Sequence, residues 1–263
     1  MVNGRPATRV GKHRLFVLLA RAWADAGFPV MRFDYRGTGD CEGELPTLEG
    51  TSEDIASAVD AFAANMPGLQ QVVLWGLCGG AADALLYAPQ DPRVMGAILV
   101  NPWTYDARVR SLVSLRHFAA RYFRRLLSFD RPIGRAGNKI EGVNAVWTAS
   151  SREPELTPAG DLSGMWGTET AVKAYRSYRS PDMSRRLAGS LEKFKGKVLM
   201  ILGGGDVGAR TFKVTTSMSL QWRRLLSASR VRLLELPEAN HSLRRPQWRQ
   251  QAAAWTIEWL KEL

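Results

Sequence analysis

A thiol stands at the centre of a glycine-rich pentapeptide, Gly76-Leu77-Cys78-Gly79-Gly80. An apolar run, Val72-Val73-Leu74-Trp75, precedes it, and a helix-like run follows. Strand, tight turn and helix in this order lift the central side chain off the edge of a sheet, where it can act as a nucleophile. Gly76 and Gly80 are expected here because a side chain at either position would collide across the turn. The pattern predicts covalent acyl transfer through the Cys78 thiol.

The later part of the chain supplies the acid and the base that such a nucleophile needs. The pattern requires an acid and then a histidine after the nucleophile. Asp206 follows the apolar run 197–202 and three glycines, and His241 follows the apolar run 231–236 and a loop. Taken singly, Cys78 also fits a small core residue, and the other two also fit ordinary turn and loop positions. Their joint order and context favour a Cys78–His241–Asp206 triad.

The same turn predicts where a developing negative charge would be stabilised. Gly79 opens the helix after Cys78, so its backbone N–H has no partner within the helix and can donate to an oxyanion. A second donor is expected near Gly4 or Arg5 in the N-terminal loop. This chemistry uses neither a cofactor nor a metal, and we expect none.

The overall composition limits the classes of partner and the compartment. The 263 residues suit one domain with an insertion, and the net charge is +11. The sequence has no signature of a nucleic-acid-binding module, so we expect no nucleic-acid partner. Arginines spread along the chain predict a solvated basic surface, with an anionic membrane face or an anionic acyl carrier as alternative partners. The apolar run 15–20 is too short for a signal peptide, and we predict a cytoplasmic protein, with peripheral contact to the inner membrane as the alternative.

Alternating strand and helix patterns predict an α/β fold with a mostly parallel sheet flanked by helices. We expect a helix at 15–26, a strand at 29–34, a helix at 51–65, a strand at 94–100 and a closing helix at 248–263. The alternation stops after Trp103, so we predict a core of residues 1–102 and 191–263 and a cap insertion of residues 103–190.

The first part of the cap, 106–129, has the pattern of one long helix with an apolar stripe and arginines on its other faces. A solvated arginine face is one interpretation, and contact with anionic lipid is the other. Residues 131–170 are rich in Gly, Pro, Ser and Thr and predict irregular structure.

Several stretches resemble one known family. The sequence is similar to the α/β-hydrolases called exosortase A system-associated hydrolase 1, within the wider serine aminopeptidase S33-like group (Hydrolase_4), over essentially the whole chain. The resemblance implies an α/β-hydrolase fold with a helical cap and a role beside bacterial exopolysaccharide and exosortase systems. The matching stretches are Arg9-Val10-Gly11-Lys12-His13-Arg14, Phe16-Val17-Leu18-Leu19-Ala20-Arg21, Phe33-Asp34-Tyr35-Arg36-Gly37, Gly76-Leu77-Cys78, Asp91-Pro92-Arg93 and Asn101-Pro102-Trp103.

The chain also departs from that family's pattern. Gly79 stands where the family has Asp, and Asn240-His241-Ser242-Leu243 stands where Asp-His-Thr-Phe is expected. Residues 1–6 resemble the end of the third strand and the oxyanion loop, so we expect the opening strands to be absent. Either the start site is assigned too late, or the sheet has an exposed edge. We therefore expect the strand 29–34 or its neighbour to lack a pairing partner, which predicts poor solubility or weak activity.

The sequence thus predicts hydrolysis of an ester or thioester through a Cys-His-Asp triad and an acyl-enzyme, with a small acyl compound, free or carrier-bound, as substrate. Two alternatives stay open: acyl transfer to a sugar or another acceptor, and a non-catalytic docking component of the same system. Cys41 is expected to fill a turn, with a regulatory disulfide to Cys78 as the alternative.

Overall fold

The computed structural model describes residues 1–4, 7–105, 109, 177 and 179–263. Four parallel strands form one sheet in the order β1-β2-β3-β4. The strands are rich in Val, Ile and Leu because helices cover both faces of a parallel sheet. Their bounds are β1 Val72–Leu77, β2 Val94–Val100, β3 Lys197–Gly203 and β4 Val231–Leu236. The predicted α/β-hydrolase fold with a mostly parallel sheet is confirmed.

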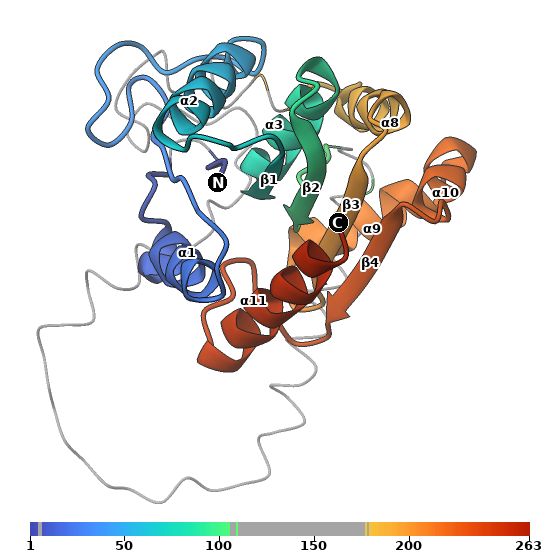
Figure 1. Ribbon diagram of the computed structural model, residues 1–263. Coiled ribbons are helices and arrows are strands. Elements are labelled where there is room, and N and C mark those ends of the chain that lie inside the picture. The colour runs from blue at the N-terminus through green and yellow to red at the C-terminus, as the bar shows by residue number, and fades with distance from the viewer. Residues whose placement is uncertain (5–6, 106–108, 110–176, 178) are drawn as a thin grey trace, which may run out of the picture.

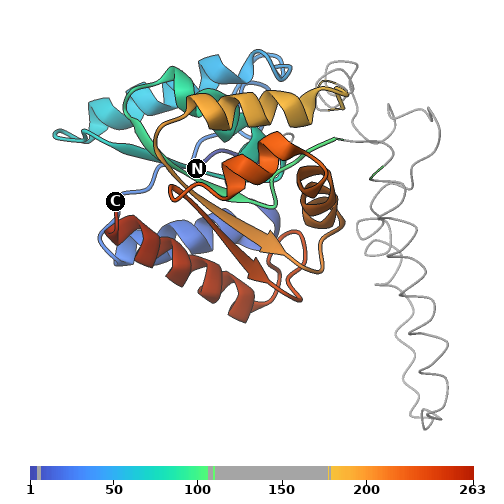
Figure 2. The same cartoon turned by 90° about the vertical axis from the view of Figure 1, so that its right-hand side faces the viewer.

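Helices cover the two faces of this sheet in separate layers, as Figures 1 and 2 show. One layer holds α2, α3 and α8, and the other holds α1 and α11. Between β3 and β4 the chain forms α9 and α10, whose buried residues join the core on the α3 side. The helices are α1 Leu15–Asp25, α2 Thr51–Asn65, α3 Gly79–Tyr87, α8 Met183–Lys193, α9 Val207–Ser217, α10 Leu220–Leu226 and α11 Pro246–Lys261, with short 3₁₀ turns at Lys12–Arg14 and Ala88–Gln90.

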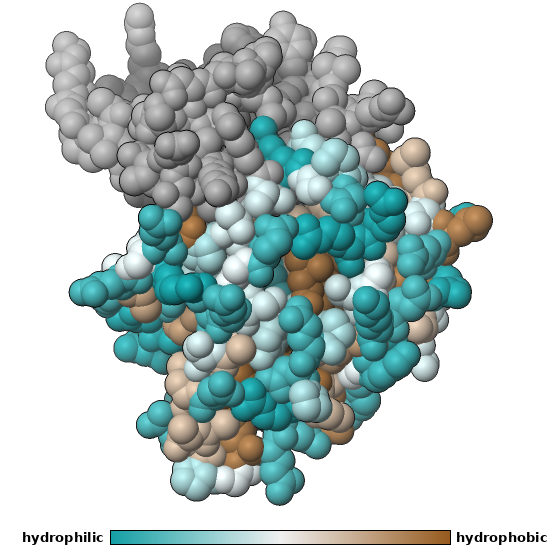
Figure 3. All heavy atoms as spheres, turned by 90° about the horizontal axis from the view of Figure 1, so that it is seen from above, coloured by the Kyte–Doolittle hydropathy of each residue, from teal (hydrophilic) through white to brown (hydrophobic). Residues whose placement is uncertain are grey.

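Alternate residues of the strands enter two different hydrophobic clusters, because successive side chains of a strand point to opposite faces. In β2, Leu99 packs with α3 and α8, whereas Ile98 and Val100 pack with α1 and α11. On the second side, Trp75 lies 5.4 Å from Phe16 between ring centroids, which places α1 against β1. The outer surface seen from the α2 side is mostly hydrophilic with small apolar areas (Figure 3). The apolar side chains are thus collected on the two faces of the sheet.

The prediction of a strand at 29–34 is wrong. This segment forms no strand in the structure. Residues 1–3 lie between it and β1: Val2 makes a single parallel bridge with Gly76, and the Met1 amine donates to the Met31 carbonyl at 2.6 Å. The Asn3 side chain donates to the carbonyl of Phe33 at 2.7 Å. Three residues are too few for a ladder, so side-chain and terminal groups replace backbone pairing.

A cavity of about 190 Å³ lies beside this junction. Its walls come from the extended segment, from β1 and from α2, including Met1, Phe28, Val30, Ala58 and Val73. The side chains on both walls are mainly apolar. The edge of the sheet beyond β1 is therefore less filled than the core between β1 and β4.

The predicted boundary between cap and core at residues 190 and 191 falls inside α8. Leu187 and Leu191 of this helix are both buried in the core cluster on the α3 side. The helix predicted at 106–129 and the irregular part predicted at 131–170 lie outside the described residues, apart from Val109. Within the described part of the chain, no helix is long and apolar enough to cross a membrane.

Candidate active site

The turn between β1 and α3 holds Cys78 in a backbone conformation that is rare for a residue with a side chain, with φ 58° and ψ −118°. A Cβ on Gly76 would lie 2.3 Å from the Gly80 carbonyl oxygen, and one on Gly80 would lie 2.3 Å from the Val2 carbonyl oxygen. Both glycines are thus required by backbone contacts. The Cys78 N–H donates to Val100 at 2.9 Å, which ties the turn to β2.

Asp206 lies at the end of β3 and caps α9. Its carboxylate accepts hydrogen bonds from the backbone N–H groups of Gly208 at 3.2 Å and Ala209 at 3.1 Å. The residue is only 4% exposed. Burial by itself would raise the pKa of Asp206, but hydrogen bonds from the His241 ring and these N–H groups outweigh burial and lower the pKa below its ordinary value. The carboxylate is therefore ionised and held in one orientation.

The His241 ring lies against Asp206, with 3.1 Å between Nδ1 and Oδ2. Its side chain is 37% exposed, so one side of the ring remains open to solvent or to a substrate. Burial acts to lower the pKa of His241, but interactions with Cys78 and Asp206 outweigh it and raise the pKa well above its ordinary value. The ring can therefore hold a proton beside the Asp206 carboxylate.

Glycines before Asp206 let the histidine loop come close to the end of β3. A Cβ on Gly204 would lie 2.1 Å from the carbonyl oxygen of Pro237, and one on Gly203 would lie 2.6 Å from that of Ala239. The Gly205 N–H donates to the Ala239 carbonyl at 3.0 Å. This contact brings the acid and the base together although 35 residues separate them.

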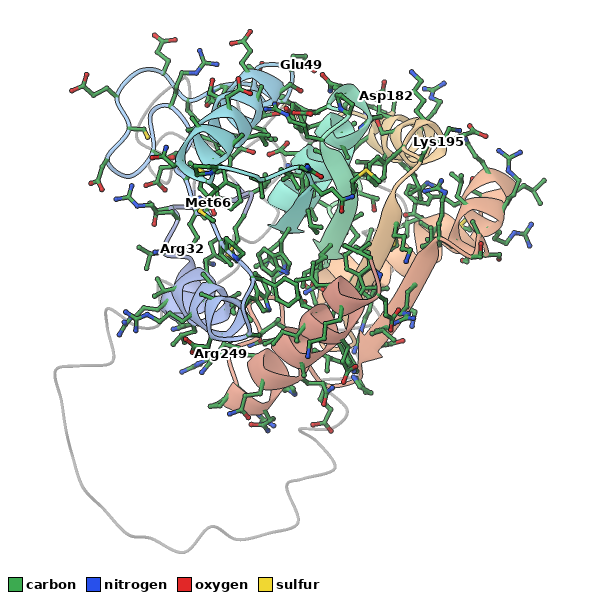
Figure 4. All side chains as sticks on the ribbon, viewed as in Figure 1. Arg32, Glu49, Met66, Asp182, Lys195 and Arg249 are labelled. Carbon is green, nitrogen blue, oxygen red and sulfur yellow. The ribbon has the colours of Figure 1, made fainter. Side chains whose placement is uncertain are left out.

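The loop that follows His241 is held by its own polar contacts. The Asn240 side chain accepts a hydrogen bond from the Arg244 N–H at 3.0 Å. Leu243 is buried with φ 47°, and the Arg249 guanidinium donates to its carbonyl at 3.5 Å. Figure 4 labels Arg249 at the N-terminal end of α11. Because Arg249 belongs to a helix of the core, the loop has a rigid support.

The residues predicted to stabilise an oxyanion lie next to the Cys78 turn. Gly79 is the first residue of α3. A Cβ on Gly4 would lie 3.3 Å from the Gly79 nitrogen and 3.1 Å from the Gly80 nitrogen, so the N-terminal segment packs directly on the turn. Arg5 lies outside the described residues. The role of these N–H groups stays a prediction.

Cys41 lies in the turn after the extended segment and is a free, exposed thiol. Its sulfur donates a hydrogen bond to the Asp34 carbonyl at 3.3 Å, and Cys78 is also free.

Among the described residues, no group of three or more His, Cys, Asp or Glu side chains could hold a metal ion.

One residue near the site was missed by reasoning from the sequence. Asn101 follows β2, is 1% exposed and has φ 45°. Its side chain accepts a hydrogen bond from the Gly203 N–H and donates one to the His241 carbonyl. The sequence shows Asn101 only as part of an Asn-Pro-Trp stretch, and nothing local to that stretch indicates either partner.

Solved structures of hydrolases share this fold. The chain is similar to a monoacylglycerol lipase of Paleococcus ferrophilus, with a TM-score of 0.57 and 20% identity, over 98% of this chain and 91% of that one. It is also similar to an esterase of Pyrococcus furiosus, with a TM-score of 0.62 and 15% identity, over 99% of this chain and 79% of that one. At this level of identity the likeness establishes the fold alone.

Matches to curated relatives are shorter and come with higher identity. Human protein ABHD12B is 34% identical over 110 residues, which are 39% of this chain and 29% of that protein. An uncharacterised 31.7 kDa protein of Escherichia coli is 35% identical over 85 residues, which are 30% of this chain and 29% of that protein. Each match thus spans less than a third of the relative's own length.

The family comparison covers most of the chain. The model described as serine aminopeptidase, S33 (Hydrolase_4), matches residues 10–243, which include Cys78, Asp206 and His241. The chain therefore belongs to the Hydrolase_4 (serine aminopeptidase, S33) family of α/β-hydrolases.

Proposed function

We propose that this hydrolase cleaves an ester or thioester of a small acyl compound through a Cys78–His241–Asp206 triad. The observation that carries the proposal is the 3.1 Å contact between His241 and Asp206, beside a cysteine that sits in a strained turn. The Cys78 sulfur and the Asp206 carboxylate both raise the pKa of His241, which supports the proposal further. Backbone strain of this kind is characteristic of functional sites.

In the first half of the proposed reaction, His241 takes the thiol proton and the Cys78 sulfur attacks the acyl carbon. The carbonyl oxygen becomes an oxyanion, which the Gly79 N–H and a donor near Gly4 stabilise. When the oxyanion collapses, the bond to the leaving group breaks and the leaving oxygen or sulfur takes the proton from His241. Asp206 stabilises the imidazolium while it carries that proton.

In the second half, water attacks the Cys78 acyl-enzyme while His241 takes one of its protons. Collapse releases the carboxylic acid, and the Cys78 sulfur regains its proton from His241. A sugar hydroxyl in place of water would give acyl transfer by the same steps. The net charge of +11 favours an anionic carrier or an anionic membrane as the source of the substrate. The stretches that resemble the exosortase A system-associated hydrolase 1 family favour an exosortase or exopolysaccharide setting.

The proposal is tested with acyl esters and acyl thioesters of graded chain length. The wild type is expected to release acid from at least one series, and Cys78→Ala is expected to lose that turnover while keeping its circular dichroism spectrum. Cys78→Ser is expected to be much slower than the wild type, because a hydroxyl needs stronger base assistance than a thiol. Wild-type turnover in Cys78→Ala would refute the nucleophile.

Thiol labelling tests the site without a substrate. In a Cys41→Ala chain, Cys78 is the single cysteine, so limiting iodoacetamide reports on it alone. Labelling is expected to be fast and to slow when His241 is replaced by Ala. Equal rates with and without His241, together with no turnover of any acyl compound, would favour a non-catalytic docking role.

A further inference from the structure

The turn after β2 contacts all three segments that carry the proposed triad. Its backbone holds the Cys78 segment: the Val100 carbonyl accepts from the Cys78 N–H at 2.9 Å, and the Trp103 N–H donates to the Cys78 carbonyl at 3.1 Å. Asn101 lies between these two contacts. This turn therefore forms a common support at the carboxyl ends of the strands.

The Asn101 side chain reaches the other two segments. Its Oδ1 accepts a hydrogen bond from the Gly203 N–H at 2.7 Å, three residues before Asp206. Its Nδ2 donates to the carbonyl of His241 itself at 3.2 Å. One planar amide thus spans the end of β3 and the histidine loop.

The type of residue is required by both its backbone and its partners. Asn101 has φ 45°, a conformation that Asn tolerates better than most residues with side chains. The residue is 1% exposed, so a lost hydrogen bond at this position would not be replaced readily by water. The planar side-chain amide of Asn offers one acceptor and one donor at a fixed separation.

We infer that Asn101 is a positioning residue, which sets the place of His241 relative to Asp206 through one rigid side chain. This inference rests on the proposed function. His241 follows β4, whose far side pairs with no other described strand, so its loop needs support from the interior of the sheet. The amide supplies that support directly at the backbone of the histidine.

Two variants test the two hydrogen bonds of this amide. Asn101→Gly keeps the backbone freedom and removes both hydrogen bonds. Asn101→Asp, assayed at a pH at which the new carboxyl group is ionised, keeps an acceptor for the Gly203 N–H but has no donor for the His241 carbonyl. Asn65→Gly is the matched control, because the Asn65 side chain also donates to a backbone carbonyl, that of Ala61, but lies at the exposed end of α2.

Both Asn101 variants are expected to lower kcat on the order of 10²-fold with little change in KM, as a small displacement of a catalytic group does. Asn65→Gly is expected to leave kcat unchanged. If Asn101→Gly does not fold, Asn101→Asp carries the test. Wild-type kcat in a folded Asn101→Asp chain would overturn the inference.

A second readout needs no substrate. The chain has three histidines, so NMR can follow the titration of the His241 ring. In Asn101→Gly the pKa of His241 is expected to fall toward its ordinary value, because the ring moves away from the Asp206 carboxylate that helps to raise it. A lower thermal midpoint with an unchanged His241 titration and an unchanged kcat would mean that Asn101 is only structural.

The two hypotheses fail in different ways. If the wild type turns over no acyl compound and its Cys78 labelling does not depend on His241, the proposed function fails. A shifted His241 titration in Asn101→Gly would then still support positioning of the ring. If the wild type is active and neither variant changes kcat or the titration, the positioning role alone is refuted.

Discussion

The four-stranded part of the sheet, called the laddered part below, and the N-terminal edge beyond β1 are held together by different kinds of hydrogen bond. From β1 to β4 the strands pair in parallel ladders, such as the one that runs from Val198 opposite Val231 to Gly203 opposite Leu236. Beyond β1 the pairing is reduced to one bridge, between Val2 and Gly76. The Met1 amine and the Asn3 side chain add hydrogen bonds there.

The proposed triad residues lie in the laddered part, whereas the N-terminal edge packs against the turn that holds Cys78. Cys78, Asp206 and His241 all follow strands of the laddered part, so backbone pairing brings the segments that carry them to one edge of the sheet. The N-terminal segment adds the close contact of Gly4 with the Cys78 turn. We therefore expect the laddered part to dominate stability and turnover, and the N-terminal edge to contribute a pH dependence through the Met1 amine and smaller packing effects.

The largest effect is expected from Asp206→Asn on the laddered side. The amide cannot stabilise the imidazolium, so kcat is expected to fall by roughly 10³- to 10⁴-fold. The pKa of His241 is expected to fall as well, because Asp206 is one of the groups that raise it. The pH profile of kcat measures both. Glu235→Gln, which removes an exposed carboxylate that pairs with Lys213, is the control and should change neither.

A matched pair of methionines compares packing on the two sides. Met200 in β3 is fully buried, whereas Met31 lies partly buried in the extended segment and lines the cavity. Met200→Ala is expected to lower the free energy of unfolding by about 2–5 kcal/mol, and Met31→Ala by about 1 kcal/mol or less. Urea denaturation measures both values. Equal losses would contradict the weaker packing of the N-terminal edge.

In a chain that begins at Met1, the buried amine predicts that the free energy of unfolding depends on pH. Burial first, and then Arg32, lower the pKa of this amine from 8.0 to about 5. Folding therefore disfavours the protonated form, so stability is lost as the pH falls from 8 toward 5. Between pH 7 and pH 5 this loss is about 2 kcal/mol.

Acetylation of the Met1 amine provides the control for that effect. The acetylated chain keeps an N–H donor for the Met31 carbonyl but cannot take up a proton in this pH range. Urea denaturation at pH 5 and pH 7 should therefore show a smaller pH dependence after acetylation, and the difference between the two chains excludes the contribution of His241. Identical pH dependence in both chains would mean that the amine is not buried.

The smallest effect is expected from filling the cavity beside the N-terminal segment. Ala58 of α2 lines this cavity, so Ala58→Leu is expected to raise the free energy of unfolding by about 0.5–1 kcal/mol through added apolar burial. Ala64→Leu, on the exposed surface of the same helix, is expected to have no such gain. A loss of stability in Ala58→Leu would mean that the cavity cannot accept the side chain.

Local sequence patterns were sufficient to predict most of the helices and strands of the core. The helix predicted at 51–65 and the strand predicted at 94–100 have those bounds in the structure, and the apolar run 231–236 forms a strand with the same bounds. These segments combine the right period with clear ends, as in the acidic first turn of α2. The glycine-flanked turn and the order of Asp206 and His241 were also visible, because they depend on short motifs and chain order.

The sequence alone determined which residues are able to do chemistry and in what order the chain presents them. Only the tertiary structure decided which of them meet, that residues 29–34 form no strand, and that Asn101 joins the end of β3 to the histidine loop. A helix or a turn depends on residues a few positions apart, so its signal is local. A strand needs a partner, and a buried amide needs a donor and an acceptor more than 100 residues away, so neither appears until the chain is folded.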